Sequence, residues 1–132
     1  MAFGVLIVDD NRLFLETARD LLEREGLRVV GVAATAAQAL QRTAELRPDI
    51  VLVDIRLGDE SGFDVAWRLA EHDRGGGAAV ILISTHSEAD FADLIAESPA
   101  VGFLSKGDLS AGAIRRIVDG SEPGEPPGAR KR

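Results

Sequence analysis

The sequence predicts an α/β fold in which helices cover both faces of a five-stranded parallel sheet. Short runs rich in Val, Ile and Leu alternate five times with longer stretches of helical periodicity. Strands buried on both faces have this near-continuous apolar character, and parallel strands need a crossover, usually a helix, between them. With 132 residues, 45% of them hydrophobic and 28% charged, the chain fits one such domain with a full core.

The alternation predicts the position of each element. The strand candidates are Gly4 to Val8, Arg28 to Ala33, Ile50 to Asp54, Ala79 to Ser84 and Val101 to Leu104. The helix candidates run from about Arg12 to Glu25, Ala36 to Leu46, Gly62 to Glu71, Glu88 to Glu97 and Ala111 to Val118.

Residues at the helix termini support these assignments. Phe14 and Leu22 fall on one face of the first helix, and Gly26 is a typical stop. Thr35 and Ser110 precede the second and fifth helices, where a hydroxyl oxygen can accept a hydrogen bond from a free backbone N–H group.

Residues 121–132 differ in composition from the rest of the chain. They are rich in Ser, Glu, Gly and Pro, end in three basic residues and show no apolar periodicity. Such segments cannot bury enough apolar surface to fold. We therefore expect one domain over residues 1–120, followed by a disordered tail over residues 121–132.

Composition argues against several classes of function. The net charge of −7 disfavours direct binding of nucleic acid, which depends on cations that neutralise phosphates, so proteins and metal cations are the expected partners. Without cysteine, the chain forms neither a disulfide nor a thiolate metal site. The apolar run Val5 to Val8 is too short to cross a membrane. We expect a cytoplasmic protein with no membrane contact.

Chemically useful side chains follow four of the five strands. Asp9 and Asp10 follow the first, Asp54 ends the third, Ser84 ends the fourth and Lys106 lies just beyond the fifth. In a doubly wound sheet of strand order 2-1-3-4-5, the strand ends share one edge and ligands bind in the crevice there. We therefore expect these side chains to gather at one site, although an Asp pair alone would more often cap a helix.

Three carboxylates in one crevice repel one another. Two unit charges 4 Å apart interact by about 1 kcal/mol in water and by about 4 kcal/mol at an effective dielectric constant near 20. Mg²⁺ would offset this repulsion, because it prefers carboxylate, water and phosphate oxygens as ligands. Zinc is disfavoured because these strand ends carry neither cysteine nor histidine. The candidate magnesium ligands are Asp9, Asp10 and Asp54.

The lysine and the hydroxyl would complete a site for phosphoryl transfer, which is catalysed mainly by positioning and by stabilising charge on the phosphoryl oxygens. Lys106 would place a positive charge beside one oxygen, and Ser84 would donate a hydrogen bond to another. Asp54 would then be the nucleophile and would form an acyl phosphate.

These residues and their spacing resemble the receiver domain of response regulators, the CheY-like superfamily of two-component signalling, from Val5 to Val118. The resemblance implies a flavodoxin-like sheet of order 2-1-3-4-5 with five helices. It is carried by four motifs: Val5-Leu6-Ile7-Val8-Asp9-Asp10, Val51-Leu52-Val53-Asp54, Ile83-Ser84 and Gly102-Phe103-Leu104-Ser105-Lys106.

The resemblance also implies roles for single residues. Asp10 and Asp54 would bind Mg²⁺ directly, together with the backbone carbonyl of Arg56, and Asp9 would bind it largely through water. Ser84 and Phe103 would form the switch. In the family the hydroxyl moves toward the phosphoryl group and the aromatic ring turns inward. This movement changes the surface made by the fourth helix, the fifth strand and the fifth helix.

By the same resemblance, the chain would be a phosphoacceptor module of a two-component phosphorelay and not an enzyme, with self-phosphorylation and self-dephosphorylation as its only chemistry. Its partners would be a sensor histidine kinase or a phosphotransfer protein and a downstream protein target, and a homodimer is left open. One alternative is the receiver part of a DNA-binding transcription regulator. Another is an aspartate-nucleophile phosphatase of the haloacid dehalogenase type, which needs a second acid where Arg56 stands.

Overall fold

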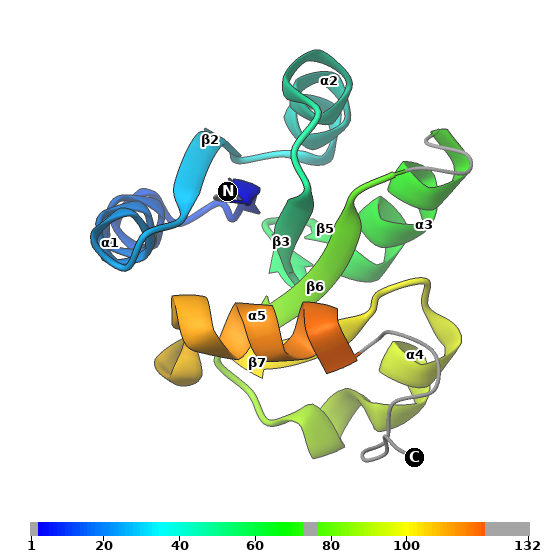
Figure 1. Ribbon diagram of the computed structural model, residues 1–132. Helices are drawn as coiled ribbons and strands as arrows, with labels where there is room; N and C mark the ends of the chain where they lie inside the picture. The colour runs from blue at the N-terminus through cyan, green and yellow to red at the C-terminus, as the bar shows by residue number, and fades with distance from the viewer. Residues whose placement is uncertain (1–2, 73–76, 121–132) are drawn as a thin grey trace.

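The computed structural model describes residues 3–72 and 77–120 and contains the expected parallel sheet (Figure 1). The sheet order is β2-β1-β3-β6-β7, which confirms the predicted order 2-1-3-4-5. All neighbouring strands of this sheet are parallel, and every residue of β1 and β3 is buried. The strands are β1 Gly4–Val8, β2 Arg28–Ala33, β3 Ile50–Asp54, β6 Ala79–Ser84 and β7 Gly102–Ser105.

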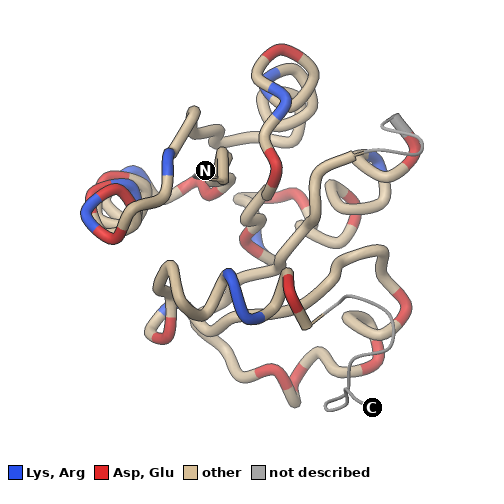
Figure 2. Tube along the Cα trace, viewed as in Figure 1, with Lys and Arg blue, Asp and Glu red and all other residues tan. Residues whose placement is uncertain are grey.

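Helices cover both apolar faces of the sheet. The helices are α1 Arg12–Arg24, α2 Ala36–Leu46, α3 Gly62–His72, α4 Ala92–Glu97 and α5 Ala111–Gly120, with short 3-10 helices η1 Glu88–Phe91 and η2 Lys106–Asp108. One core cluster joins the sheet to α1 and α5, and the other joins it to α2 and α3 (Figure 1). Charged residues lie mainly on the helices and connections (Figure 2). In the five strands only Arg28 and Asp54 are charged.

Side chains cap the helices where the sequence indicates. Thr35 Oγ1 and Ser110 Oγ each accept a hydrogen bond from the backbone N–H of the third residue of the following helix, at 3.1 and 3.0 Å. Both predicted caps are therefore confirmed. Asn11 caps α1 in the same way, since its Oδ1 accepts from Phe14 N at 3.1 Å. Gly26, at the end of α1, has a φ of 98°, which glycine adopts without strain.

The predicted fourth helix is divided in the structure. It begins as the 3-10 helix η1 and becomes α-helical at Ala92. Phe91, between the two parts, has φ −127° and ψ 18°, outside the helical region. Its ring packs on Phe63 and His86 at centroid distances of 6.2 and 6.0 Å, and the ring of His86 meets it edge-on.

The bounds of β7 differ slightly from the prediction. The fifth strand of the sheet begins and ends one residue later than predicted, at Gly102 and Ser105. The tail expected over residues 121–132 lies outside the described residues. None of the helices in residues 3–72 and 77–120 has the length and apolar character that a membrane crossing requires.

A short antiparallel hairpin follows β3 and was not predicted. Its strands, β4 Arg56–Leu57 and β5 Glu60–Ser61, flank Gly58 and Asp59. Gly58 has a φ of 62°, and a two-residue loop that begins with glycine is a known hairpin signal. The Glu60 carboxylate accepts a hydrogen bond from Ala36 N at 2.9 Å. The segment after Asp54 is therefore tied to the start of α2.

Gly62, at the start of α3, packs directly against the end of β3. A Cβ atom at this position would lie 2.1 Å from the carbonyl oxygen of Asp54 and 2.8 Å from Cα of Ile55. Gly62 N also donates a hydrogen bond to Ile55 O at 2.7 Å. Only a residue without a side chain permits this approach.

We expect Gly62→Ala to lower the free energy of unfolding by about 1–3 kcal/mol or more, because the added methyl group overpacks rigid backbone. Urea denaturation would measure the loss. Gly107→Ala is the matched control, since a Cβ atom there would meet nothing within 4 Å, and it should stay within about 0.5 kcal/mol of the wild type. Equal stability of the two variants would contradict the close approach.

Candidate functional site

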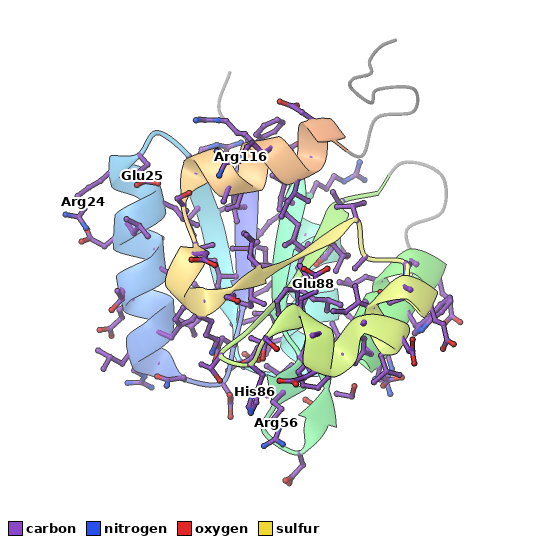
Figure 3. The ribbon with its side chains drawn as sticks, turned by 90° about the horizontal axis from the view of Figure 1, so that it is seen from below. Arg24, Glu25, Arg56, His86, Glu88 and Arg116 are labelled. Carbon is purple, nitrogen blue, oxygen red and sulfur yellow. The ribbon has the colours of Figure 1, made fainter. Side chains whose placement is uncertain are left out.

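The carboxyl ends of β1, β3, β6 and β7 form one edge of the sheet, and a pocket of about 330 Å³ lies there. The structure brings to this pocket all five side chains that were expected to gather at this edge. The lining residues are Asp9, Asp10, Asn11, Asp54, Arg56, Gly58, Ser84, Thr85, His86 and Lys106. Figure 3 shows Arg56 and His86 at the same end of the molecule, beside this pocket.

Three carboxylates meet in the pocket. Carboxylate oxygens of Asp9, Asp10 and Asp54 all lie within 4.8 Å of one another. Asp9 is fully buried, Asp54 is 7% exposed and Asp10 is open to solvent. The pocket therefore combines a buried acidic floor with an acid at its entrance.

Lys106 is the counter-ion of the two buried acids. Its Nζ lies 2.6 Å from Asp9 Oδ2 and 3.0 Å from Asp54 Oδ2, and its side chain is only 15% exposed. The same Nζ lies 4.4 Å from the centre of the Phe14 ring. A single ammonium cannot neutralise three carboxylates, so the pocket retains an excess of negative charge.

Backbone N–H groups hold the other oxygen of each buried acid. Asp54 Oδ1 accepts a hydrogen bond from Arg56 N at 3.0 Å, and Asp9 Oδ1 accepts one from Asn11 N at 2.8 Å. Asp9 Oδ2 is buried, lies 2.6 Å from the Lys106 ammonium and receives no backbone hydrogen bond among the described residues. This buried oxygen and its neighbours fit a cation, because hard cations such as Mg²⁺ take carboxylate oxygens as ligands.

Burial and charge shift the pKa values of the central pair. The pKa of Asp54 is raised, mainly by burial and also by the negative charge of Asp9. The hydrogen bonds from Lys106 and from Arg56 N lower this pKa but do not cancel the effect of burial. Burial alone would lower the pKa of Lys106, but its hydrogen bonds and ion pairs with Asp9 and Asp54 together raise it. The pocket thus keeps the lysine charged while ionisation of Asp54 is disfavoured.

Ser84 and Phe103 lie on neighbouring strands. Ser84 is 4% exposed, pairs in register with Ser105 beside Lys106, and its Oγ accepts a hydrogen bond from His86 N at 2.9 Å. Phe103 is half-buried and packs on the α2–α3 side of the sheet. Ser84 lines the pocket whereas Phe103 does not.

Sequence reasoning missed several residues in this pocket or in contact with it. Asn11 could have been found, because Asn directly before an apolar helical pattern is an N-cap signal. The pocket wall formed by Gly58 follows from the Gly-Asp hairpin signal described above. The contact of Phe14 with Lys106 had no sequence signal, since its spacing is that of an ordinary core residue.

Residues 5–118 match the family model of the response regulator receiver domain. The chain belongs to this family. The response regulator GacA of Pseudomonas viridiflava is 30% identical over 114 residues, which cover 86% of this chain and 52% of GacA.

Solved structures of receivers have the same fold. The signal receiver domain of a modulated diguanylate cyclase from Desulfovibrio desulfuricans G20 is 34% identical with a TM-score of 0.74, and the match covers 92% of this chain and 94% of that one. A LuxR-family two-component response regulator from Aurantimonas sp. SI85-9A1 is 29% identical with a TM-score of 0.79, covering 92% and 86%.

Family membership makes this chain a receiver module of two-component signalling with a CheY-like, flavodoxin-like sheet. Receivers are signalling modules rather than dedicated enzymes, and Arg56 stands where the alternative phosphatase would need its second acid. The chain spans about half the length of the curated relatives it matches.

We expect Asp54→Asn to stabilise the receiver in the absence of metal at pH 7, because it removes a carboxyl whose ionised form is disfavoured in the folded state. The raised pKa means that the folded wild type binds the carboxyl proton of Asp54 more tightly than the unfolded chain does. The stability of the wild type therefore falls as the pH rises from the ordinary Asp range through the raised pKa of Asp54. The advantage of the variant should therefore shrink as the pH falls toward about 4.

Urea denaturation in a chelator from pH 4 to 7 would measure this difference. Asp119→Asn is the control, because it removes an exposed carboxylate of α5 outside the pocket. A variant Asp54→Asn no more stable than the wild type at pH 7 would show that the charge of Asp54 is fully compensated in the folded protein.

Proposed function

We propose that Asp54 is the phosphoacceptor and that its Mg²⁺-dependent phosphorylation switches contacts between proteins. The observation that carries this proposal is the setting of the Asp54 carboxylate. It is the one charged group of a buried central strand, and it lies between the ammonium of Lys106 and the backbone N–H of Arg56. An acid that is buried for structural reasons does not need two further carboxylates beside it. A reaction that is assisted by a bound cation does need them, because they would be the ligands of that cation.

Asp9, Asp10 and Asp54 would hold the Mg²⁺ ion, with the backbone carbonyl of Arg56 as a further ligand. The support for this set is the closeness of the three carboxylates and the buried Asp9 Oδ2, which receives no backbone hydrogen bond among the described residues. When bound, Mg²⁺ supplies positive charge that stabilises the phosphoryl oxygens during transfer. Asp10, exposed at the entrance, would let the ion exchange with solvent.

The transfer itself uses the side chains of this chain. An oxygen of Asp54 forms a bond to phosphorus, and the bond between phosphorus and the donor nitrogen of a phosphohistidine breaks. The electron pair leaves with the imidazole, which takes a proton from solvent. Lys106 stays charged throughout, which is consistent with the raised pKa of its ammonium. Its ammonium stabilises the negative charge of the phosphoryl oxygens.

Ser84 and Phe103 would report the new group to the surface. A phosphoryl group adds a charge of about −1.5 to −2, and turning the Ser84 hydroxyl toward it would end the hydrogen bond from His86 N. The His86 ring meets Phe91 of η1 edge-on, so this change reaches the segment that leads into α4. Phe103 would turn inward as Ser84 moves.

The output surface would comprise α4, β7 and α5. Leu94 and Val101 are 52% and 39% exposed there. Figure 2 shows the η1–α4 segment with acidic residues, and no Lys or Arg occurs in the described chain from residue 77 to residue 105. We therefore expect the part of a protein target that meets η1 and α4 to be basic and partly apolar, whereas α5 adds the exposed Arg115 and Arg116 to this surface. The acids are Glu88, Asp90, Asp93 and Glu97.

A second candidate is the receiver part of a DNA-binding regulator. Its support is the half-length match to longer relatives, among them the DNA-binding transcriptional activator EvgA of Escherichia coli K12. In either case the phosphodonor would be a histidine kinase or a phosphotransfer protein in the cytoplasm. The net charge of −7 disfavours direct contact between this chain and nucleic acid.

Incubation with acetyl phosphate and Mg²⁺ should add one phosphoryl group to the wild type by intact-mass spectrometry. Asp54→Asn should add none, and a chelator should prevent the reaction. Asp119→Asn, which leaves the pocket intact, should react like the wild type. A phosphorylated Asp54→Asn variant would assign the acceptor to another residue.

Ser84→Ala separates phosphorylation from its readout. We expect this variant to accept the phosphoryl group but to lose most of the difference in partner affinity between the phosphorylated and free forms, because no hydroxyl turns toward the phosphoryl oxygens. A pull-down with the beryllium fluoride form and the free form measures that difference. An unchanged difference would rule out the serine switch.

A further inference from the structure

We propose that Phe14 is a positioning residue for Lys106, holding the ammonium where it meets the incoming phosphoryl group. This inference rests on the proposed function of Lys106. Phe14 lies on the first turn of α1, and its ring centre is 4.4 Å from Lys106 Nζ. An ammonium this close to a ring face is attracted by the ring quadrupole, and more strongly where water is excluded. The Lys106 side chain is only 15% exposed.

The position of the ring is fixed from the same pocket. Asp9 Oδ1 accepts a hydrogen bond from Asn11 N at 2.8 Å, and Asn11 Oδ1 accepts one from Phe14 N at 3.1 Å. Phe14 contacts the ammonium of Lys106, which in turn lies 2.6 Å from Asp9 Oδ2. Asp9 therefore holds both the backbone turn that positions Phe14 and the ammonium that Phe14 contacts.

A lysine in this role has a specific need for such a partner. Its charge sits on a flexible four-carbon stem with three rotatable donors, and Asp9 and Asp54 both attract it. The ring attracts the cation without offering a directional acceptor. The N–H groups of Lys106 therefore remain available for Asp54 and for phosphoryl oxygens.

A purely structural role for Phe14 makes a different prediction. The residue is half-buried and packs on the core cluster beneath α1 and α5, a task that leucine can also perform. Phe3, half-buried on the same cluster and directly before β1, is a matched control because the same replacement there removes a ring far from the strand carboxyl ends.

The experiment compares the wild type with Phe14→Leu, Phe14→Tyr and Phe3→Leu at equal folded fraction. We expect Phe14→Leu to slow phosphorylation by acetyl phosphate by about threefold to tenfold, with Mg²⁺ affinity unchanged. Phe14→Tyr keeps the ring face and should retain the wild-type rate, as should Phe3→Leu. In proton NMR spectra, the Lys106 side-chain protons should lose their ring-current shift in Phe14→Leu alone.

Equal rates for Phe14→Leu and Phe3→Leu would overturn the proposal, as would a parallel loss of Mg²⁺ affinity, which would mean that Phe14 supports the whole pocket. A wild type that is phosphorylated on Asp54 but indifferent to Phe14→Leu would refute only this inference. A wild type that accepts no phosphoryl group would refute the proposed function, and the positioning role with it.

Discussion

The ammonium of Lys106 between the buried carboxylates of Asp9 and Asp54 is the interaction on which the functional site depends. Removing any one of these charges from water is costly unless a partner compensates it. Here one ammonium faces two buried acids while Asp10 adds a third carboxylate within 4.8 Å. The site therefore keeps an excess of negative charge, which favours a divalent cation, and the charge of that cation would in turn favour a phosphoryl group beside Asp54.

The parallel sheet determines where the acids of the site can lie. Strands Gly4–Val8 and Ile50–Asp54 are buried on both faces, so they can bring acids together only where they end. The parallel order places those ends on the same edge of the sheet as the end of β7, which is separated from β3 by β6 and is followed by Lys106. Gly62 then returns the chain against the Asp54 backbone at a distance that no other residue allows. Functional sites that gather like charges in this way commonly lower the stability of the fold.

The sheet and most of the pocket could be predicted from the sequence for a physical reason. Apolar runs bounded by polar residues define buried strands, and strand ends in a doubly wound sheet converge, so Asp54 and Lys106 could be assigned to one site although 52 positions separate them. The hairpin at Gly58 was missed because its two-residue strands show no periodicity that would accompany the Gly-Asp turn signal. The division of the fourth helix was missed because it depends on tertiary packing of Phe91, which no local pattern encodes.

The identity of the phosphorylated side chain decides whether Asp54 is the acceptor. Borohydride reduces an acyl phosphate on aspartate to a homoserine side chain, which peptide mass spectrometry can locate. After treatment with a phosphodonor and Mg²⁺, we expect conversion at Asp54 alone, and none when a chelator is present. Phosphate found on Ser84 or His86, or conversion of Asp54 that is indifferent to Mg²⁺, would contradict it.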